Sequence, residues 1–274
     1  MALKFIKMHG CGNDYVYVDA FRETVTDAPA LARRVADRHF GVGSDGLILV
    51  LPSERGDVRM RMYNADGSEA EMCGNGVRCL AKLAYEAGHA RKPEIAVEVG
   101  REGKTRVLPI RVTVKDDRVE AARVDMGKPE VAAAEETVEG VIGLRVSVGN
   151  PHFVVFDEPS DANVLGLGPK LEMASAFPDR SNIEFARVKN IAADGRFAQI
   201  QLRVWERGSG ETLACGTGAC ATAAAAIALG RTGGARSVSV ELRGGTLGID
   251  WPDPAGSILM TGPCVEVFRG ELSA

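Results

Sequence analysis

The sequence predicts an α/β fold in which one unit occurs twice. Two observations predict it: a cysteine-containing motif is repeated, and the segments around its two copies follow one another in the same order. The chain has 274 residues, which is long enough for two domains. A repeat that keeps its internal order indicates duplication of a single unit. We therefore expect two pseudo-symmetric α/β domains packed face to face.

The repeated motif places a cysteine directly before a glycine-rich turn. The first copy is Asn64-Ala-Asp-Gly-Ser-Glu-Ala-Glu-Met-Cys73-Gly-Asn-Gly, and the second is Glu206-Arg-Gly-Ser-Gly-Glu-Thr-Leu-Ala-Cys215-Gly-Thr-Gly. Each copy runs into an alanine-rich apolar stretch, which is typical of a helix. Gly88 and Gly230 follow these stretches and are expected to end the helices, since glycine readily adopts the left-handed conformation found there.

Three further blocks occur once in each half of the chain, and they follow the same order in both halves. Gly12-Asn13-Asp14-Tyr15 resembles Gly149-Asn150-Pro151-His152, and Ser44-Asp45-Gly46 resembles Ser181-Asn182-Ile183. The strand-like run that ends at Tyr63 resembles the run that ends at Trp205. Because all blocks keep their order, the duplication is expected to cover most of the chain.

The elements of each half are expected in the order strand, helix, strand, strand, helix and three strands. In the first half the ranges are Val16–Asp19, Pro29–His39, Leu47–Leu51, Val58–Tyr63, the helix from Cys73 to Gly88, Ile95–Val99, Val107–Val114 and Arg118–Val124. In the second half they are Phe153–Phe156, Gly168–Phe177, Glu184–Val188, Ala198–Trp205, the helix from Cys215 to Gly230, Ser237–Leu242, Gly245–Trp251 and Ser257–Thr261. A last strand, Val265–Leu272, is free to pack on either half.

Two of these patterns also predict burial. Apolar and polar residues alternate along Val58–Tyr63 and Ala198–Trp205, as in strands with one wet face. Ala221–Ala226 offers methyl groups on every side of a helix, with one hydroxyl from Thr222. Such a helix is better enclosed by a sheet than placed on the surface.

The domain boundary is expected at Asp116-Asp117, where charge interrupts the strand pattern. Residues 1–116 then form the first half and residues 117–262 the second, with the strand in residues 263–274 as a candidate to pack back onto the first half. The acidic stretch Glu130–Glu139 is expected as a surface loop.

Composition excludes several classes of function. A net charge of −4 and the lack of a basic stripe argue against nucleic-acid binding. The run Ala219–Leu229 is too short to span a membrane, and the N-terminal segment lacks the apolar core of a secretory signal. The six cysteines show no paired Cys-x-x-Cys spacing, and the four histidines form no cluster, so neither a disulfide framework nor a metal site is expected. We expect a cytoplasmic protein.

Cys73 and Cys215 are the candidate catalytic residues. A cysteine thiol has a pKa near ~8.5, and the start of a helix is expected to lower it toward neutrality through its N–H groups and dipole. A group that titrates near the working pH is an efficient general base. Two such thiols in matching positions predict a pair of bases that face one substrate from opposite sides.

Other residues near the turns are candidates for binding. The turn residues Gly74, Asn75, Gly216 and Thr217 offer backbone and side-chain donors to an anion. Arg207 can clamp a carboxylate, and Glu206 can accept an ammonium group or orient a proton transfer. His152 is a candidate proton partner. Asparagines recur at equivalent turns, and their amides can hold carboxylate and ammonium groups; they are Asn13, Asn64, Asn150 and Asn182.

The motifs resemble one known family over nearly the whole chain. They are Gly10-x-Gly-Asn13-Asp14, Asn64-Ala-Asp-Gly-Ser, Cys73-Gly-Asn-Gly-x-Arg-Cys79, Gly149-Asn-Pro-His152 and Glu206-Arg-Gly-x-Gly-Glu-x-x-Ala-Cys215-Gly-x-Gly. Their order and content resemble the diaminopimelate epimerase family. The resemblance implies an isomerase that needs no cofactor and interconverts LL- and meso-diaminopimelate in bacterial lysine and peptidoglycan-precursor synthesis. It also implies a homodimer.

The resemblance further implies a fold and a set of roles. Each domain would be a curved, mostly antiparallel sheet around a central helix, with the active site in the cleft between domains. Cys73 and Cys215 would transfer protons, His152 and Glu206 would support catalysis, and the remaining candidates and Glu206 would contact substrate. Many members of the family have Gln at the position of Gly46, so no substrate contact is expected from that position here.

Three alternatives remain at this stage. The first is a proline racemase-like or hydroxyproline epimerase with the same architecture, although several asparagines and an arginine suit an open-chain substrate better. The second is a cysteine hydrolase or acyl transferase, which would need one thiol and a histidine rather than two equivalent thiols. The third is a non-catalytic binding module, against which the presence of both thiols argues.

Overall fold

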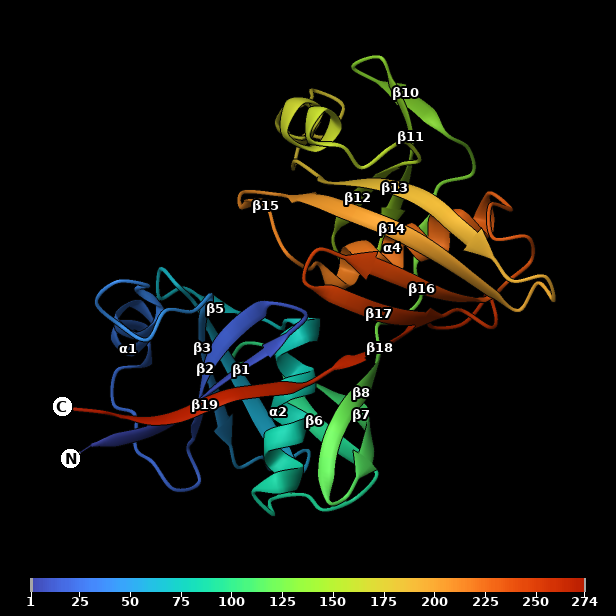
Figure 1. Ribbon diagram of the computed structural model, residues 1–274. Coiled ribbons are helices and arrows are strands. Elements are labelled where there is room, and N and C mark those ends of the chain that lie inside the picture. Colours follow the sequence, from blue (N-terminus) through green and yellow to red (C-terminus); the bar gives the residue numbers. More distant parts are fainter. Residues whose placement is uncertain (1, 274) are drawn as a thin grey trace. The chain divides into compact units, whose positions relative to one another are not determined.

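The computed structural model describes residues 2–273, and the chain divides into two compact units (Figure 1). The first unit runs to Val124 and includes the residues from Gly262 onward, whereas the second is Asp125–Thr261. Asp116 and Asp117 have φ angles of 49° and 61° and form a two-residue turn within a hairpin of the first unit. The charges that interrupt the strand pattern therefore mark a hairpin turn, and the chain leaves the first unit only after the second strand of that hairpin.

In the first unit, described strands pair side by side in the order β19-β1-β2-β3-β4-β6-β7-β8. Their bounds are β1 Leu3–Gly10, β2 Asn13–Asp19, β3 Gly46–Leu51, β4 Val58–Asn64, β6 Glu94–Val99, β7 Arg106–Lys115, β8 Arg118–Asp125 and β19 Val265–Leu272, and the short β5 (Glu69–Ala70) pairs with β4. The β2–β3 and β4–β6 pairs are parallel and the others antiparallel. The last strand thus completes the sheet of the first unit.

The second unit repeats this order as β9-β11-β12-β13-β14-β16-β17-β18. The bounds are β9 Glu130–Val131, β11 Val141–Ser147, β12 Pro151–Val155, β13 Asn182–Ile191, β14 Phe197–Glu206, β16 Ser237–Leu242, β17 Gly245–Asp250 and β18 Leu259–Pro263; β10 (Glu136–Val138) pairs with β11 and β15 (Gly210–Glu211) with β14. Parallel pairs fall at the same two places as in the first unit. The matching order confirms the predicted duplication.

One long helix packs inside the curve of each sheet, as predicted (Figure 1). Helix α2 (Gly74–Glu86) contacts β1, β2, β3, β4, β6 and β7, and α4 (Gly216–Ala228) contacts β9, β11, β12, β13, β14, β16 and β17. Residues Ala221–Ala226 of α4 are all inaccessible to solvent. Gly88 and Gly230 have φ angles of 86° and 69°, and they follow the ends of the two helices as predicted.

The opposite face of each sheet is covered by a smaller helical segment. Helix α1 (Ala28–Ala36) packs on β2, β3 and β4; it is shorter than predicted, because Asp37 is extended and its carboxylate accepts bonds from the N–H groups of His39 and Phe40. The predicted helix 168–177 is present only over its first part, as the short α3 (Gly168–Glu172), and a π-helical turn, η1 (Ala162–Leu167), precedes it. The acidic stretch 130–139 is largely exposed but includes the short strands β9 and β10.

Candidate functional site

The first half-site lies where β2 begins and α2 begins. Cys73 is the residue before α2, and its Sγ donates a hydrogen bond to Asn13 Oδ1 at 3.2 Å. The Asn13 amide is oriented by Asp45, whose Oδ2 accepts from Asn13 Nδ2 at 2.7 Å. Arg38 in turn donates to Asp45 Oδ1 at 2.9 Å. The carboxylate therefore fixes which end of the Asn13 amide meets the sulfur.

Asn64 lies two strands away at the same end of the sheet. In the register of the sheet, Gly46 pairs with Tyr15 on one side and with Asn64 on the other. The Asn64 side chain is exposed and donates to Ser68 Oγ at 3.0 Å. A Cβ atom at Gly46 would lie 2.0 Å from the Tyr63 carbonyl oxygen. The backbone thus has no room for a side chain at this position.

The second half-site is a chain of hydrogen bonds between buried or half-buried side chains. Glu184 Oε1 lies 2.6 Å from His152 Nδ1, and both side chains are fully buried. His152 Nε2 lies 2.9 Å from Asn150 Oδ1. Asn150 Nδ2 donates to Thr217 Oγ1 at 3.3 Å, and this hydroxyl lies 3.5 Å from Cys215 Sγ. The imidazole and its carboxylate are therefore linked to the sulfur through two side chains.

Asn182, Glu206 and Arg207 lie at the same end of this sheet. Asn182 pairs in register with His152, and its Oδ1 accepts from the Arg207 backbone N–H at 3.0 Å. The Arg207 side chain is exposed and donates to the Asp179 carbonyl at 2.9 Å. Glu206 Oε1 accepts from the Thr212 hydroxyl. The structure thus brings the predicted residues of each repeat to one end of their own sheet, beside the first residues of α2 and α4.

Burial outweighs the helix terminus at Cys73. The N–H groups of Asn75 and Gly76 and the Tyr15 hydroxyl favour the thiolate, as expected at a helix start. The loss of water around the sulfur is nevertheless the largest effect and raises the pKa of Cys73 above its ordinary value. The expectation of a pKa near neutrality was wrong, because it left desolvation out.

The pKa of Cys215 is raised further, well above its ordinary value. Burial is again the largest cause, and the negative charges of Glu206 and Glu184 add to it. The Thr217 hydroxyl and the Gly218 N–H, which donates to Cys215 Sγ at 3.4 Å, act in the opposite direction. The two sulfurs therefore differ in the charges around them although their backbones correspond.

This difference predicts an effect of Glu206→Gln on thiol reactivity. Removing a negative charge near Cys215 favours its thiolate, so the pKa of Cys215 falls. Alkylation of Cys215 by iodoacetamide at pH 8, followed by peptide mass spectrometry, is expected to become several-fold faster. The matched control is Glu211→Gln, because the charge of Glu211 is already paired with Arg203 and Arg243. Equal rates in both variants would contradict the assigned effect of Glu206.

Sequence reasoning missed three residues of the two half-sites. Glu184 supports His152, Asp45 orients Asn13, and Tyr15 lies against Cys73. A signal existed for Glu184, because a lone charge within the apolar run Ile183–Ala186 of a buried strand needs a buried partner. Tyr15 also held a signal, since it occupies the place of His152 in the first repeat.

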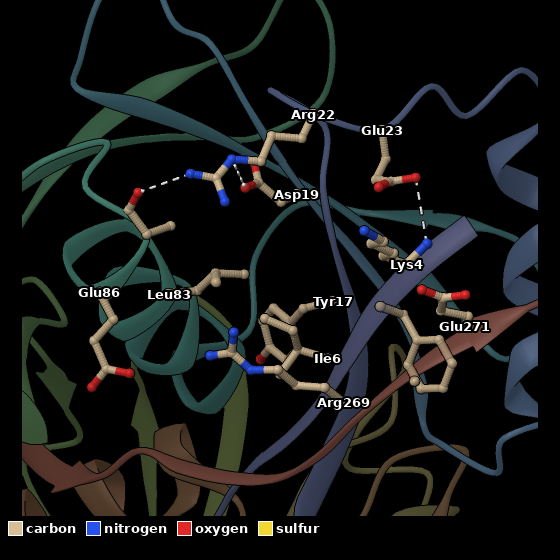
Figure 2. Close-up of a pocket in the computed structure, with 13 residues that line it drawn as sticks. Lys4, Ile6, Tyr17, Asp19, Arg22, Glu23, Leu83, Glu86, Arg269 and Glu271 are labelled. Atoms are coloured by element: carbon tan, nitrogen blue, oxygen red, sulfur yellow. Dashed lines mark hydrogen bonds and ion pairs between the residues drawn. The ribbon is translucent and has the colours of Figure 1, made fainter. Parts of the chain in front are cut away.

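A pocket on the surface of the first unit has no part in either half-site. It has a volume of about 480 Å³ and lies in the first unit, lined by thirteen residues of β1, β2, the end of α2 and β19 and of adjoining loops (Figure 2). None of them is a predicted site residue. Its charged groups have partners: Arg22 pairs with Asp19, and Arg269 with Glu266.

Residues 2–273 lack a metal-binding cluster, a membrane-spanning helix and a disulfide. No group of three or more His, Cys, Asp or Glu side chains there could hold a metal ion. No helix in the described part of the chain is long and apolar enough to cross a membrane. None of the six cysteines, all of them described, takes part in a disulfide.

Comparison with known proteins decides the family. The family model described as diaminopimelate epimerase matches residues 5–132 and 144–267. The chain belongs to the diaminopimelate epimerase family. Among its relatives, the diaminopimelate epimerase of Desulfovibrio desulfuricans is 46% identical and the alignment covers 99% of this chain and 98% of the relative. That of Bacteroides thetaiotaomicron is also 46% identical, over 98% of each chain.

Solved structures with little sequence identity share the fold of the diaminopimelate epimerase family. A PhzF-family phenazine biosynthesis protein of Bacillus anthracis has a TM-score of 0.71 at 17% identity, over 100% of both chains. A hydroxyproline epimerase of Agrobacterium vitis, with bound trans-4-hydroxy-L-proline, has a TM-score of 0.67 at 13% identity, over 99% of this chain and 91% of that one. These likenesses confirm the predicted two-domain fold, and membership of the family confirms the prediction of an isomerase that acts on amino acids.

Proposed function

We propose that this protein converts LL-diaminopimelate to meso-diaminopimelate by two-base proton transfer between Cys73 and Cys215, without pyridoxal phosphate or metal. One observation carries the proposal: each duplicated unit sets a cysteine directly before the central helix of its sheet, in a chain that belongs to the diaminopimelate epimerase family. The relatives that bear this name align over nearly the whole chain.

Inversion at an α-carbon requires two proton-transfer groups. One group removes the hydrogen from one face, and the other returns a proton to the opposite face. In this proposal one cysteine acts as thiolate and the other as thiol, and their roles exchange in the reverse reaction. Their pKa values, raised by burial, bring the sulfurs closer in basicity to the weakly acidic carbon than unperturbed thiols are.

The other residues are proposed to hold the substrate and its developing charge. The N–H groups at the start of α2 and α4, beginning with Gly74 and Gly216, suit a carboxylate that gains enolate character. Asn75 and Thr217 lie in the same turns. The remaining proposed contacts are with the two amino-acid head groups of the substrate and involve Asn13, Asn64, Asn150, Asn182, Glu206 and Arg207.

His152 and Glu206 are proposed to tune Cys215. His152 reaches the sulfur through Asn150 and Thr217, and its imidazole is held by Glu184. The charge of Glu206 keeps Cys215 protonated until substrate binds. This arrangement supports a resting enzyme in which Cys215 is the proton donor.

The test is exchange of the substrate α-hydrogen with solvent. Reduced protein incubated with diaminopimelate in D₂O, without added pyridoxal phosphate or metal, is expected to incorporate deuterium at the epimerised carbon as the isomers equilibrate. Proton NMR measures the exchange, and trans-4-hydroxy-L-proline is the comparison substrate. Exchange of hydroxyproline alone would favour the proline racemase alternative, and exchange of neither compound by folded, reduced protein would refute the proposal.

Two further parts of the proposal concern the state of the protein. We propose a homodimer in the cytoplasm that binds a small amino-acid substrate and neither nucleic acid nor membrane. The net charge of −4 supports the proposal that the protein does not bind nucleic acid. The exposed apolar side chains Val265, Val267 and Phe268 along β19, a strand at the end of its sheet, support a self-association surface.

A further inference from the structure

One face of β2 points toward the start of α2. Side chains two apart in a strand share a face, so Asn13, Tyr15 and Tyr17 lie in a row. Asn13 contacts the Cys73 sulfur, and the Tyr17 hydroxyl donates to the Gly76 carbonyl of α2 at 3.1 Å. Tyr15 lies between Asn13 and Tyr17 on the same face of the strand, and only 5% of it is exposed. Its hydroxyl favours the Cys73 thiolate.

We propose that Tyr15 is a positioning residue for Cys73: its hydroxyl donates a hydrogen bond to the sulfur and stabilises the thiolate. The inference rests on the proposed function of Cys73 as a base. The donor remains available at working pH, because burial holds the pKa of Tyr15 well above its usual value. A hydrogen bond to a charged group is stronger than one to a neutral group, so this contact favours the thiolate over the thiol.

Asn13 and Tyr15 act on opposite forms of the sulfur. Asn13 Oδ1 accepts the thiol hydrogen, since Asp45 holds the amide with its nitrogen turned away. The Tyr15 hydroxyl donates instead to the thiolate. The other charged or titratable groups that face this site are Arg78 on α2, which favours the thiolate, and Asp45 and Tyr17, which act on Tyr15 or Cys73 at longer range. The Cys73 sulfur thus has a hydrogen-bond partner both as a thiol and as a thiolate.

The residue that supports the cysteine differs between the two units of the repeat. Tyr15 occupies the position that His152 holds in the second unit. His152 bonds to Glu184 and reaches Cys215 through Asn150 and Thr217, whereas the proposed interaction of Tyr15 with Cys73 has no intervening side chain. A neutral phenol therefore serves the first sulfur, and an imidazole with its carboxylate serves the second.

The test compares Tyr15→Phe with the unaltered protein. This variant removes one oxygen atom and preserves the aromatic ring. The matched control is Tyr63→Phe, which makes the same change in the core beneath α1. Iodoacetamide alkylation of Cys73 is measured against pH by peptide mass spectrometry. In Tyr15→Phe the midpoint is expected to rise by about one pH unit, so that alkylation at pH 8 slows about tenfold. The difference in alkylation rate between the two proteins should vanish at pH values above both midpoints. A merely structural change would alter the rate at every pH.

Measurement of epimerisation separates this inference from the proposed function. At pH 8, kcat/KM of Tyr15→Phe is expected to fall several-fold, and Tyr63→Phe is expected to match the unaltered protein. An unchanged Cys73 midpoint in a folded Tyr15→Phe variant would overturn the role of Tyr15, even if the enzyme epimerises diaminopimelate. A shifted midpoint in a protein without epimerase activity would leave the role of Tyr15 intact and refute the proposed function.

Discussion

Replacing either Cys73 or Cys215 with alanine is expected to lower the rate of epimerisation by about 10²- to 10⁴-fold, the range typical of a lost general acid or base. In the proposed mechanism each half of the reaction needs its own sulfur, so a single remaining thiol would not complete the inversion. The measurement is interconversion of LL- and meso-diaminopimelate by the two purified variants, assayed separately. Because the two residues act in one step, the double variant is expected to be little worse than either single one.

The two alanine variants should also differ from one another. In the proposed mechanism each thiol serves one side of the α-carbon, so each variant is expected to exchange the α-hydrogen of only one stereoisomer with D₂O. Cys220→Ala is the control, since Cys220 lies within α4 and is fully buried. Inversion at the normal rate in either Cys73→Ala or Cys215→Ala would contradict the two-base mechanism.

Ala224→Leu is expected to destabilise the protein by about 3 kcal/mol, the upper part of the range for an overpacked core. Ala224 has no exposed surface, and α4 is enclosed by the strands of its own unit, so three extra carbon atoms have no free space to occupy. Urea denaturation followed by circular dichroism measures the loss as a lower midpoint.

The matched control for this prediction lies on the same helix. Ala228→Leu makes the same chemical change at an exposed position, where leucine is well tolerated in a helix. Its denaturation midpoint is expected to stay close to that of the unaltered protein. Similar losses in both variants would show that α4 is not confined as its burial indicates.

Much of the fold follows from local sequence pattern. Alternating residues located β4 and β14, and the two glycines located the ends of α2 and α4. The repeat predicted two equivalent units, and a surface made mostly of methyl groups predicted the enclosure of α4. These signals are strong because each depends on a few neighbouring residues.

The errors in the fold arose where local pattern competes with other structure. The apolar residues at 168–177 suggested one helix, but the chain forms a π-helical turn and then a short α-helix with Pro169 in its first turn. Charge at residues 116–117 suggested a boundary where the chain makes a hairpin turn. The pairing of β19 with β1 joins segments far apart in sequence, which no local pattern could decide.

The residues that form the site were easier to predict from the sequence than the pKa values of its thiols. The repeated turns pointed to Cys73, Cys215, Asn13 and Asn150, and the structure links them within their own half-sites. The pKa of each thiol depends on burial and on charges from separate strands. The spacing of residues along the sequence reveals neither of them. Glu184, for example, is distant from Cys215 in sequence but contributes to its raised pKa.

The place of β19 in the first sheet has a consequence for synthesis on the ribosome. This strand follows the entire second unit in sequence but pairs with β1, near the opposite end of the chain. While the ribosome is still translating the residues after Thr261, every strand of the second unit's sheet up to β17 has already been made. The first unit must wait for its outer strand, so the half that is translated first is the half that is completed last.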